Sequence, residues 1–404
     1  MVTVEPRFYE SATDSENECL VPESLNVIRT PAVDVLLARR FGVGDIGMRS
    51  LWHHWKESCR LCSSQQVDLV FISVPPYAPM VLGRLLHSRF GLPYVIDYQD
   101  PWVTDYYWRL PRKQRPPKWP VAYALSRILE PFALRHASGL VGVSKGTTDR
   151  VTERYDWSQR IPTAEIPLGG EPADFEYLTQ HPRSHGIFDP HDGMRHISYV
   201  GACIAPMYPA VQAILRAVRT GLERSPRLFS KLRLHFVGSS YAPPGSQVEA
   251  TVVKMAHEHG ISHLVEECPA RVPYLDSLQL LLDSDALLLI GSEEPHYTAS
   301  KVFPYILAGR PIIAVMHKAS SVVEILKSTG AASLVTFDGE HPPLLSVEIL
   351  SRYLEDVLAS RTEIARRLPY EAFKNHTTRA MAELLAAFFD NVTQPSRLPQ
   401  GAFA

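Results

Sequence analysis

One lysine stands where the chain is suited to bind an anion. Lys301 follows the apolar run of residues 285–292 and precedes a short helical pattern that stops at Gly309, before a second apolar run at residues 310–315. This order predicts a buried strand, a loop, a helix and a second buried strand. The lysine and the helix N-terminus would lie at the carboxyl end of a parallel sheet, where unpaired N–H groups and a cation bind phosphate well. A phosphate or diphosphate is the predicted ligand.

Buried strand candidates alternate with helical patterns along the chain, which is typical of parallel sheets covered by helices. The expected strands are residues 67–74, 93–98, 139–144, 164–169, 196–201, 232–238, 263–268, 286–291, 310–315 and 333–338. A chain of 404 residues suits two domains rather than one core. We expect an α/β protein of two Rossmann-like, doubly wound domains that face a cleft.

The sequence also predicts the boundaries of the two domains. Residues 1–176 and 196–375 are expected to form the two domains, and the polar segment 177–195, rich in His, Pro and Gly, is expected to link them. Residues 376–404 would form a C-terminal helix and tail. This helix is expected to cross back to the first domain with an apolar side made of Met381, Leu384, Leu385, Phe388 and Phe389.

Bulk properties exclude several classes of protein. The net charge of −2 argues against general nucleic-acid binding, which needs a basic face. The sequence has no run of eighteen apolar residues and no N-terminal targeting pattern, so we expect a cytoplasmic protein. The five cysteines are scattered, and the Cys59–Cys62 pair cannot complete a tetrahedral zinc site, so we expect reduced thiols and no metal.

Gly42, Gly44 and Gly47 match the GxGxxG spacing of a dinucleotide-binding loop. That loop needs a buried strand before it and an acid at the end of the next strand. The residues before Gly42 are amphipathic and charged, and Asp68 begins its expected strand instead of ending it. We interpret the segment as an ordinary loop and helix start, with nicotinamide-cofactor binding as the alternative.

The segment 297–315 resembles the donor-binding segment of two-domain GT-B glycosyltransferases, specifically the retaining family 4. The matching positions are Ser300, Lys301, Tyr305, Gly309, Arg310 and Pro311. Residues 97–102, 139–145 and 166–170 resemble other parts of that family. The resemblance implies transfer of a sugar, with retained configuration, from a nucleotide-diphosphate donor to a hydroxyl of a glycan or polyprenyl-linked acceptor. It implies no cofactor beyond that donor substrate, and it makes residues 1–176 the acceptor side and residues 196–375 the donor domain.

The donor site implied by this resemblance centres on Lys301, which would stabilise the departing diphosphate. Gly201 ends an expected strand at the position where backbone N–H groups approach the phosphates. The other implied donor-binding residues are Gly238, Ser239, Val272, Pro273, Glu294, His296, Ser300 and Tyr305. Plain turn chemistry at strand ends is the alternative for several of them.

On the acceptor side, Asp100 follows an expected strand and could orient or deprotonate the acceptor hydroxyl. Capping of the following turn is the alternative for this aspartate. The other acceptor-side candidates are Asp97, Trp102, Ser144, Lys145, Gly169 and Gly170.

Three departures from the family pattern leave the activity open. Pro304 holds the second position of the family's E-x7-E motif, His296 holds the first, and no cation follows Gly201. Residues 1–5 resemble a second strand, as though the first strand, loop and helix were missing. A GT-B sugar-nucleotide epimerase and a non-catalytic glycosyltransferase-like partner are therefore the alternative hypotheses.

Five cations lie in the loop from Arg109 to Lys118, beside several aromatic residues. Aromatic and basic residues together suit an anionic membrane surface or a polyprenyl-phosphate acceptor. Peripheral contact with the inner face of a membrane is the resulting prediction, and a solvated loop is the alternative.

Overall fold

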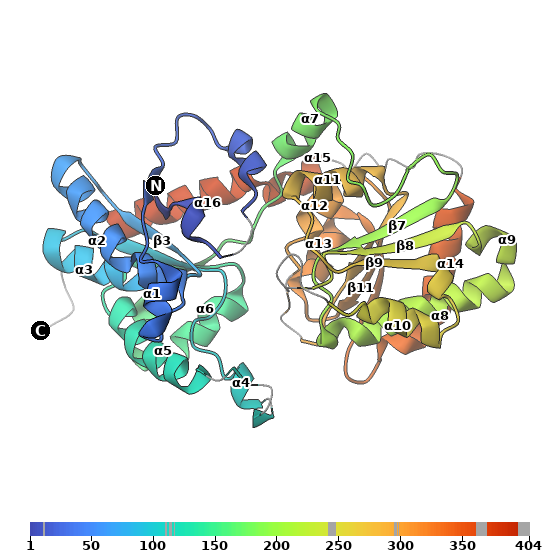
Figure 1. Ribbon diagram of the computed structural model, residues 1–404, viewed down its shortest axis with the longest axis horizontal. Coiled ribbons are helices and arrows are strands. Elements are labelled where there is room, and N and C mark those ends of the chain that lie inside the picture. The colour runs from blue at the N-terminus through green and yellow to red at the C-terminus, as the bar shows by residue number, and fades with distance from the viewer. Residues whose placement is uncertain are drawn as a thin grey trace, which may run out of the picture. The chain divides into compact units, whose positions relative to one another are not determined.

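The chain folds into two compact units. The computed structural model describes residues 1–10, 13–109, 111–112, 115–116, 118–240, 248–294, 297, 299–360 and 370–394. Unit 1 comprises Met1–Thr13, Val21–Leu168 and Met381–Ala404, and unit 2 comprises Asp14–Leu20 and Gly169–Ala380. Figure 1 shows a parallel sheet with helices around it in each of them.

Unit 1 is built on four parallel strands in the order β3-β4-β5-β6, which span Val70–Val74, Tyr94–Tyr98, Gly139–Gly142 and Thr163–Glu165. Its helices are α1 (Val35–Arg40), α2 (Ile46–Ser64), α3 (Met80–Phe90), α4 (Tyr106–Arg109), α5 (Trp119–Leu134) and α6 (Lys145–Thr152). One face of the sheet packs against α3, α5 and α6 through a cluster that includes Tyr94, Ile96 and Tyr98. The other face of β4 and β5 is buried as well, through Val95 and Val141, and burial of both faces explains their nearly continuous apolar sequence.

The beginning of the chain forms a separate two-stranded parallel sheet from β1 (Val2–Val4) and β2 (Ile28–Thr30). The buried Arg49 of α2 donates to the carbonyl oxygens of Phe8 (2.7 Å) and Val33 (3.0 Å) and so holds this segment to the unit. A helix, α1, precedes the glycines at positions 42, 44 and 47, where a dinucleotide-binding loop would need a strand.

Unit 2 contains six parallel strands in the order β12-β11-β10-β7-β8-β9. They span β7 (Arg195–Val200), β8 (Leu232–Val237), β9 (Val265–Cys268), β10 (Ala286–Ile290), β11 (Ile312–His317) and β12 (Ala332–Phe337). The helices are α7 (Pro172–Gln180), α8 (Tyr208–Arg224), α9 (Pro226–Phe229), α10 (Thr251–Glu258), α11 (Tyr274–Asp283), α12 (Val302–Leu307), α13 (Ser321–Thr329), α14 (Val347–Ala359) and α15 (Tyr370–Phe373). Helices α8, α10 and α14 cover one face of the sheet, and α11, α12 and α13 cover the other. All five residues of β10 are buried as a result.

The segment 177–195, expected to be a linker, is part of unit 2. Arg183 forms ion pairs with Asp276 (2.5 Å) and Glu16 (2.7 Å). The Phe188 ring stacks on His196 with ring centroids 4.0 Å apart. The polar and His-rich composition therefore reflects specific partners on the sheet, and the chain passes between the units at Leu168–Gly169 and Ala380–Met381 instead.

The two chain segments that connect the units run side by side near Gly170 and Thr378. Gly170 N donates to the His376 carbonyl, and Thr378 N donates to the Gly170 carbonyl, both at 2.9 Å. A Cβ added to Gly169 would lie 2.5 Å from Thr378 N, so only glycine allows this close approach of two backbones.

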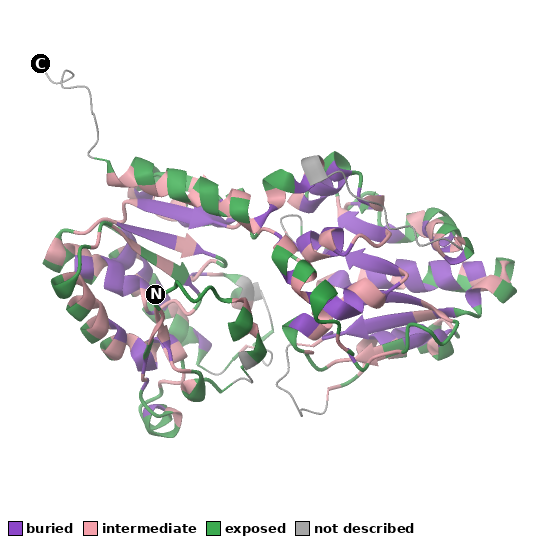
Figure 2. Ribbon diagram, turned by 90° about the horizontal axis from the view of Figure 1, so that it is seen from above, coloured by how far each residue is buried: buried purple, intermediate pink, exposed green. Residues whose placement is uncertain are grey.

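The C-terminal helix α16 (Thr378–Thr393) returns to unit 1, as predicted. Its apolar side packs on the second face of the four-stranded sheet, and Figure 2 shows it lying along buried strands. Leu384, which was expected on that side, is 52% exposed and lies on the solvent side instead. The residues that pack are Met381, Leu385, Phe388, Phe389 and Val392. No helix in the described part of the chain has the length and apolar character needed to span a bilayer.

Candidate active site

Lys301 lies in the loop between β10 and α12 and contacts a buried tyrosine. Its Nζ donates a hydrogen bond of 2.7 Å to Tyr199 Oη and lies 4.1 Å from the centroid of the same ring. Tyr199 is fully buried in β7, and its hydroxyl donates to the Ala202 carbonyl at 2.6 Å. The tyrosine orients the ammonium but brings no negative charge to it.

Gly201 leaves the space that the ammonium occupies. A Cβ added to this residue would lie 2.5 Å from Lys301 Nζ. Its φ of 127° is also a conformation that side-chain-bearing residues rarely adopt. The strands β7 and β10 are neighbours in the sheet, so their carboxyl ends bring Gly201 and Lys301 together.

The surroundings of Lys301 make it an unusual lysine. Burial removes water from the ammonium and lowers the pKa of Lys301 to about 7. The nearby Cys203 acts weakly in the opposite direction, and burial raises the pKa of its own thiol to about 12. Within the described residues, no ion pair joins Lys301 to a carboxylate. A desolvated cation without a counter-charge is suited to bind an anion.

The first turn of α12 differs from the prediction. Val302 N donates to the Ala299 carbonyl (3.0 Å) and Phe303 N donates to the Ser300 carbonyl (3.3 Å). The expected unpaired N–H groups at this helix start are therefore already used by the preceding turn. The anion-binding potential rests on the Lys301 side chain instead.

Tyr305 is a buried positioning residue in α12. Its hydroxyl accepts a 2.7 Å hydrogen bond from Val200 N, at the end of β7 and directly before Gly201. This bond ties the helix that follows Lys301 to the strand that precedes Gly201. Desolvation raises the pKa of Tyr305, so it remains a neutral phenol. Pro304 is the third residue of this short helix, where a missing N–H costs little.

The carboxyl ends of β7, β8 and β9 form a second group of candidate residues. A Cβ added to Gly238 would lie 3.9 Å from both Gly201 N and Arg271 Cα. Val272 and Pro273 follow Arg271 directly and lead into α11. The structure thus brings Gly201, Gly238 and the loop of residues 271–273 to one edge of the sheet.

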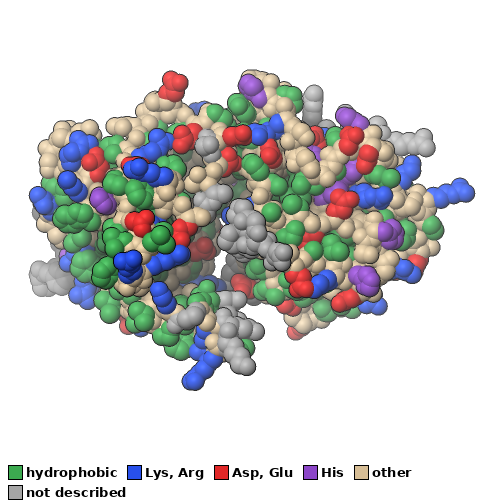
Figure 3. All heavy atoms as spheres, viewed as in Figure 1, with side chains coloured by type: hydrophobic (Ala, Val, Ile, Leu, Met, Phe, Trp, Pro, Cys, Tyr) green, Lys and Arg blue, Asp and Glu red, His purple; other side chains and the backbone are tan. Residues whose placement is uncertain are grey.

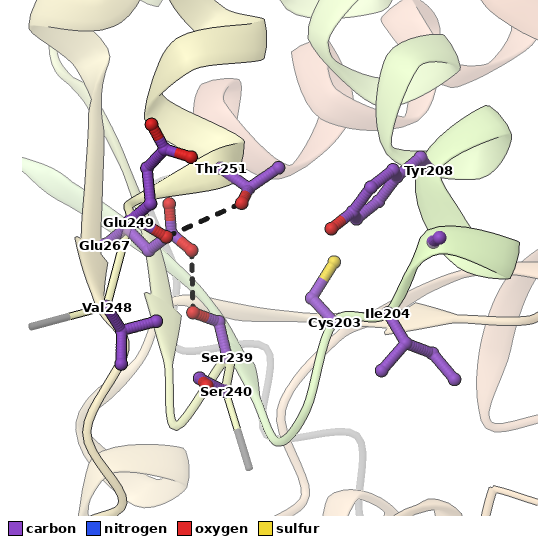
Figure 4. Close-up of a pocket in the computed structure, with 10 residues that line it drawn as sticks. Cys203, Ile204, Tyr208, Ser239, Ser240, Val248, Glu249, Thr251 and Glu267 are labelled. Carbon is purple, nitrogen blue, oxygen red and sulfur yellow. Dashed lines mark hydrogen bonds between the residues drawn. The ribbon is translucent and has the colours of Figure 1, made fainter. Parts of the chain in front are cut away.

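A pocket of about 360 Å³ opens beside these strand ends (Figure 4). Ser239 donates to Glu267 Oε1 at 2.6 Å, while Glu267 Oε2 accepts from Val252 N (2.8 Å) and Val253 N (3.2 Å) at the start of α10. The residues that line the pocket are Cys203, Ile204, Ala205, Tyr208, Ser239, Ser240, Val248, Glu249, Thr251 and Glu267.

Glu267 and Tyr199 were not identified as site residues from the sequence. A tyrosine within a buried strand, whose hydroxyl needs a partner, was the available signal for Tyr199.

The remaining donor-side candidates precede Lys301 in the chain. Glu294 and Ser300 are exposed, and Glu294 N donates to Ser292 Oγ at 3.1 Å. His296 lies outside the described residues. The roles of Glu294, His296 and Ser300 stay predictions.

On unit 1, two aspartates lie at the carboxyl end of β4. Asp97 accepts a hydrogen bond of 2.7 Å from Ser73 Oγ, and burial raises the pKa of its carboxyl group. Asp100 follows the strand and is exposed, yet partial desolvation raises its pKa as well. A carboxylate of raised pKa is a stronger base than an ordinary aspartate.

The other acceptor-side candidates have structural contacts of their own. Trp102 stacks on Tyr77 with centroids 5.5 Å apart, and both partly buried rings pack against the core cluster of the unit. Ser144 precedes α6, where its Oγ lies 3.1 Å from Thr147 Oγ1, and Lys145 is exposed. Gly169 and Gly170 lie against the backbone of residues 376–378, beside the two segments that connect the units. Contact of any of these residues with an acceptor stays a prediction.

Two further predictions concern metals and the basic loop. Among the described residues, no three His, Cys, Asp or Glu side chains come together as a metal site. In the loop from Arg109 to Lys118, residues 110, 113, 114 and 117 lie outside the described residues. Arg115 stacks on Trp108, with its guanidinium carbon 5.3 Å from a ring centroid.

Comparison with known proteins agrees with this architecture. Residues 6–169 match the family model of the glycosyl transferase 4-like domain. No curated protein matches the sequence. Among solved structures, the UDP-forming α,α-trehalose-phosphate synthase of Burkholderia xenovorans has a TM-score of 0.58 at 12% identity, over 87% of this chain and 77% of its own.

Two further structures are similar. Sucrose-phosphate synthase of Thermosynechococcus elongatus has a TM-score of 0.57 at 14% identity, over 98% of this chain and 89% of its own. A trehalose-6-phosphate protein of E. coli, bound with UDP-2-fluoro glucose, has a TM-score of 0.54 at 14% identity, over 86% of this chain and 78% of its own. Their similarity in structure establishes the fold class.

The two doubly wound units and the returning C-terminal helix thus define a GT-B fold. Residues 6–169 match the glycosyl transferase 4-like domain, and this match indicates an enzyme of the glycosyltransferase class.

Proposed function

We propose that the protein transfers a hexose from a nucleotide-diphosphate donor to a hydroxyl group of a glycan or polyprenyl-linked acceptor. Transfer would retain the anomeric configuration and need no metal. The observation that carries the proposal is the Lys301 ammonium, which lies against Gly201 in a desolvated position, with no ion pair to a carboxylate of the described residues.

A diphosphate would supply the missing counter-charge. When it binds, Lys301 takes up or keeps its proton, and the ammonium faces the oxygen on which negative charge develops as the sugar departs. A preoriented lysine acts without reorganisation at that moment, because Tyr199 already fixes its position. This arrangement replaces the metal that other diphosphate-releasing enzymes use.

The nucleoside of the donor is proposed to bind at the neighbouring strand ends. Gly238 and the loop with Val272 and Pro273 would flank the base, and the pocket lined by Ser239 and Thr251 offers hydroxyl groups for the ribose. Uracil is the first candidate base. Similar structures include a UDP-forming synthase and a protein bound with UDP-2-fluoro glucose.

The acceptor is proposed to bind on unit 1, where Asp100 would orient its hydroxyl and accept its proton. The raised pKa of Asp100 supports this role. A lipid-linked acceptor would bring the enzyme to the inner face of a membrane, with the loop from Arg109 to Lys118 in contact with it. The protein is accordingly proposed to act in the cytoplasm.

The test is thermal stability in the presence of UDP, GDP, ADP, dTDP and CMP. A nucleotide at one hundred times its dissociation constant adds about 2.7 kcal/mol of stability. We expect one diphosphate, first of all UDP, to stabilise the wild type. Lys301→Met, which keeps the length of the side chain, should abolish this effect, whereas the exposed Lys327→Met should not.

Absence of stabilisation by every nucleotide would contradict the proposal and favour a non-catalytic partner protein. Interconversion of a bound sugar nucleotide without any acceptor would favour an epimerase instead.

A further inference from the structure

Helix α5 presents an apolar stripe to solvent. Val121, Leu125, Ile128 and Phe132 are 73%, 38%, 67% and 43% exposed. Their spacing of four, three and four residues puts them on one side of the helix. The other side is buried in unit 1 through residues such as Ala133 and Leu134. Contiguous exposed apolar side chains of this kind mark interaction sites more often than isolated ones do.

The short helix α1 carries a second exposed apolar group. Leu36 and Leu37 are 70% and 49% exposed, and Phe41, directly after the helix, is 80% exposed. Lys118 Nζ donates to the Gly42 carbonyl at 3.4 Å, which joins the start of α5 to the turn after α1. We call the exposed apolar residues of these two helices, together with Phe41, the α1–α5 face.

Aromatic side chains lie beside the start of α5. Trp108 is 47% exposed and contacts Trp119 and Tyr123, with ring centroids 6.3 Å and 5.6 Å away. Tryptophan and tyrosine are the side chains that favour the boundary between lipid and water.

The charges around the α1–α5 face are mostly positive. Arg40, Lys118, Arg127 and Arg135 are exposed, and no ion pair within the described residues joins them to a carboxylate. The only acid in α5, Glu130, is fully buried and pairs with Arg154 at 2.8 Å. On the side of unit 1 seen in Figure 3, hydrophobic side chains lie beside basic ones, with acidic side chains among them.

The nearby acids of α1 are already engaged. Asp34 caps the start of the helix, accepting from Leu36 N (2.9 Å) and Leu37 N (3.1 Å). Glu10 forms an ion pair with Arg39 at 2.6 Å. Asp105, beside the start of α5, accepts from Tyr123 Oη at 3.0 Å, and Asp45 caps α2 by accepting from Met48 N at 2.9 Å. The face therefore combines apolar side chains with a small excess of cations, since the exposed Arg39, Arg40, Lys118, Arg127 and Arg135 outnumber these four acids.

We propose that the α1–α5 face docks on the surface of an anionic lipid bilayer. Leu, Ile and Phe side chains would enter the boundary between headgroups and acyl chains, while the Arg and Lys side chains reach the anionic headgroups. A second copy of the chain fits less well, because it would place like charges opposite one another. Docking would bring unit 1 to a lipid-linked acceptor, and in that respect only it rests on the proposed function.

The test is flotation of the full-length protein with vesicles of phosphatidylcholine alone or with about one third phosphatidylglycerol. We expect the wild type to float with the anionic vesicles and much less with the neutral ones. The double variant V121S/I128S should lower the partition coefficient roughly tenfold or more. The control L345S/I349S removes two exposed aliphatic side chains of unit 2 and should float like the wild type.

Retained nucleotide stabilisation and an unchanged melting temperature would show that V121S/I128S is folded. The nucleotide measurement needs no vesicles. The donor proposal can therefore fail while membrane docking holds, and membrane docking can fail while the donor proposal holds. Equal flotation of the wild type and V121S/I128S would overturn the inference, as would absence of flotation. A wild-type dimer that V121S/I128S converts to a monomer, without vesicle binding, would assign the face to a second copy.

Discussion

Lys301 Nζ lies 2.7 Å from Tyr199 Oη, although 102 residues separate the two in the sequence. The phenol accepts from the lysine and donates to the Ala202 carbonyl, so one buried hydroxyl links the loop after β10 to the turn after β7. Because the phenol is neutral, the ammonium keeps its charge available for a ligand.

Diphosphate affinity should depend on pH through Lys301. Its pKa of about 7 in the free protein means that it carries a proton below that pH and loses it above. A bound diphosphate favours the protonated form, so above pH 7 binding requires uptake of a proton. The association constant should therefore fall, approaching about tenfold per pH unit, between about pH 7 and pH 9.

Isothermal titration calorimetry in buffers of different ionisation enthalpy would measure both the affinity and the proton uptake. The range lies above the second pKa of a phosphate, about 6, so the ligand keeps its charge. The matching nucleoside without phosphates serves as the control and should bind independently of pH. A flat diphosphate profile would show that Lys301 does not meet the phosphates.

Tyr199→Phe should weaken diphosphate binding about tenfold, because the lysine loses its hydrogen bond while the ring beneath it remains. The Ala202 carbonyl also loses its donor, and the free energy of unfolding should fall by about 1–2 kcal/mol. Titration calorimetry and urea unfolding measure the two effects.

Tyr94→Phe is the matched control. Tyr94 is also fully buried, and its hydroxyl donates to the Ala133 carbonyl at the same distance of 2.6 Å, but in unit 1. This variant should lose similar stability and bind the nucleotide normally. Equal loss of affinity in both variants would mean that general destabilisation, and not the position of Lys301, explains the Tyr199 result.

Gly201→Ala should abolish stabilisation by the diphosphate. The new methyl group would meet Lys301 Nζ at 2.5 Å and push the ammonium away, and the φ of 127° is strained for alanine. Gly193→Ala separates these causes, since Gly193 has a φ of 81° and no atom within 4 Å of an added Cβ. Both variants should lose about 1–3 kcal/mol of stability, but only Gly201→Ala should lose the response to nucleotide in a thermal-shift titration.

Phe388→Ala should loosen the return of α16 to unit 1. The ring contacts Gly139, where an added Cβ would lie 2.7 Å from it, and packs with Val95 and Val141. Removal of this half-buried ring should lower the free energy of unfolding by about 2–3 kcal/mol. Leu384→Ala, on the exposed side of the same helix, should cost under about 0.5 kcal/mol. Urea denaturation distinguishes the two, and equal losses would argue against the packing described.

Much of the fold was predictable because the signals were local. The alternation of short apolar runs with helical patterns predicts parallel strands and covering helices, and nine of the ten expected strand regions share most of their residues with an observed strand. The remaining region, residues 164–169, overlaps only the last two residues of β6. The positions of Lys301 and Gly201 at strand ends follow from the same local pattern.

Two expectations were wrong for different reasons. The segment 177–195 was interpreted as a linker because its residues are polar, but Arg and Phe side chains there find partners on unit 2, which lie outside the local pattern. The first N–H groups of α12 were expected to be unpaired, but the turn directly before the helix supplies carbonyls. A second backbone segment also passes against Gly169 and Gly170, and their contact with an acceptor stays a prediction.

The amino-acid sequence by itself determined which segments become buried strands and helices, and hence that a lysine and a glycine lie at the carboxyl edge of one sheet. The tertiary structure alone decided that Tyr199 holds Lys301, that no described carboxylate pairs with it, and that α1 and α5 expose apolar faces. Periodicity reports the burial of a residue along its own element. The partner of a buried polar group and the cover of an apolar face depend on segments brought together only when the chain folds.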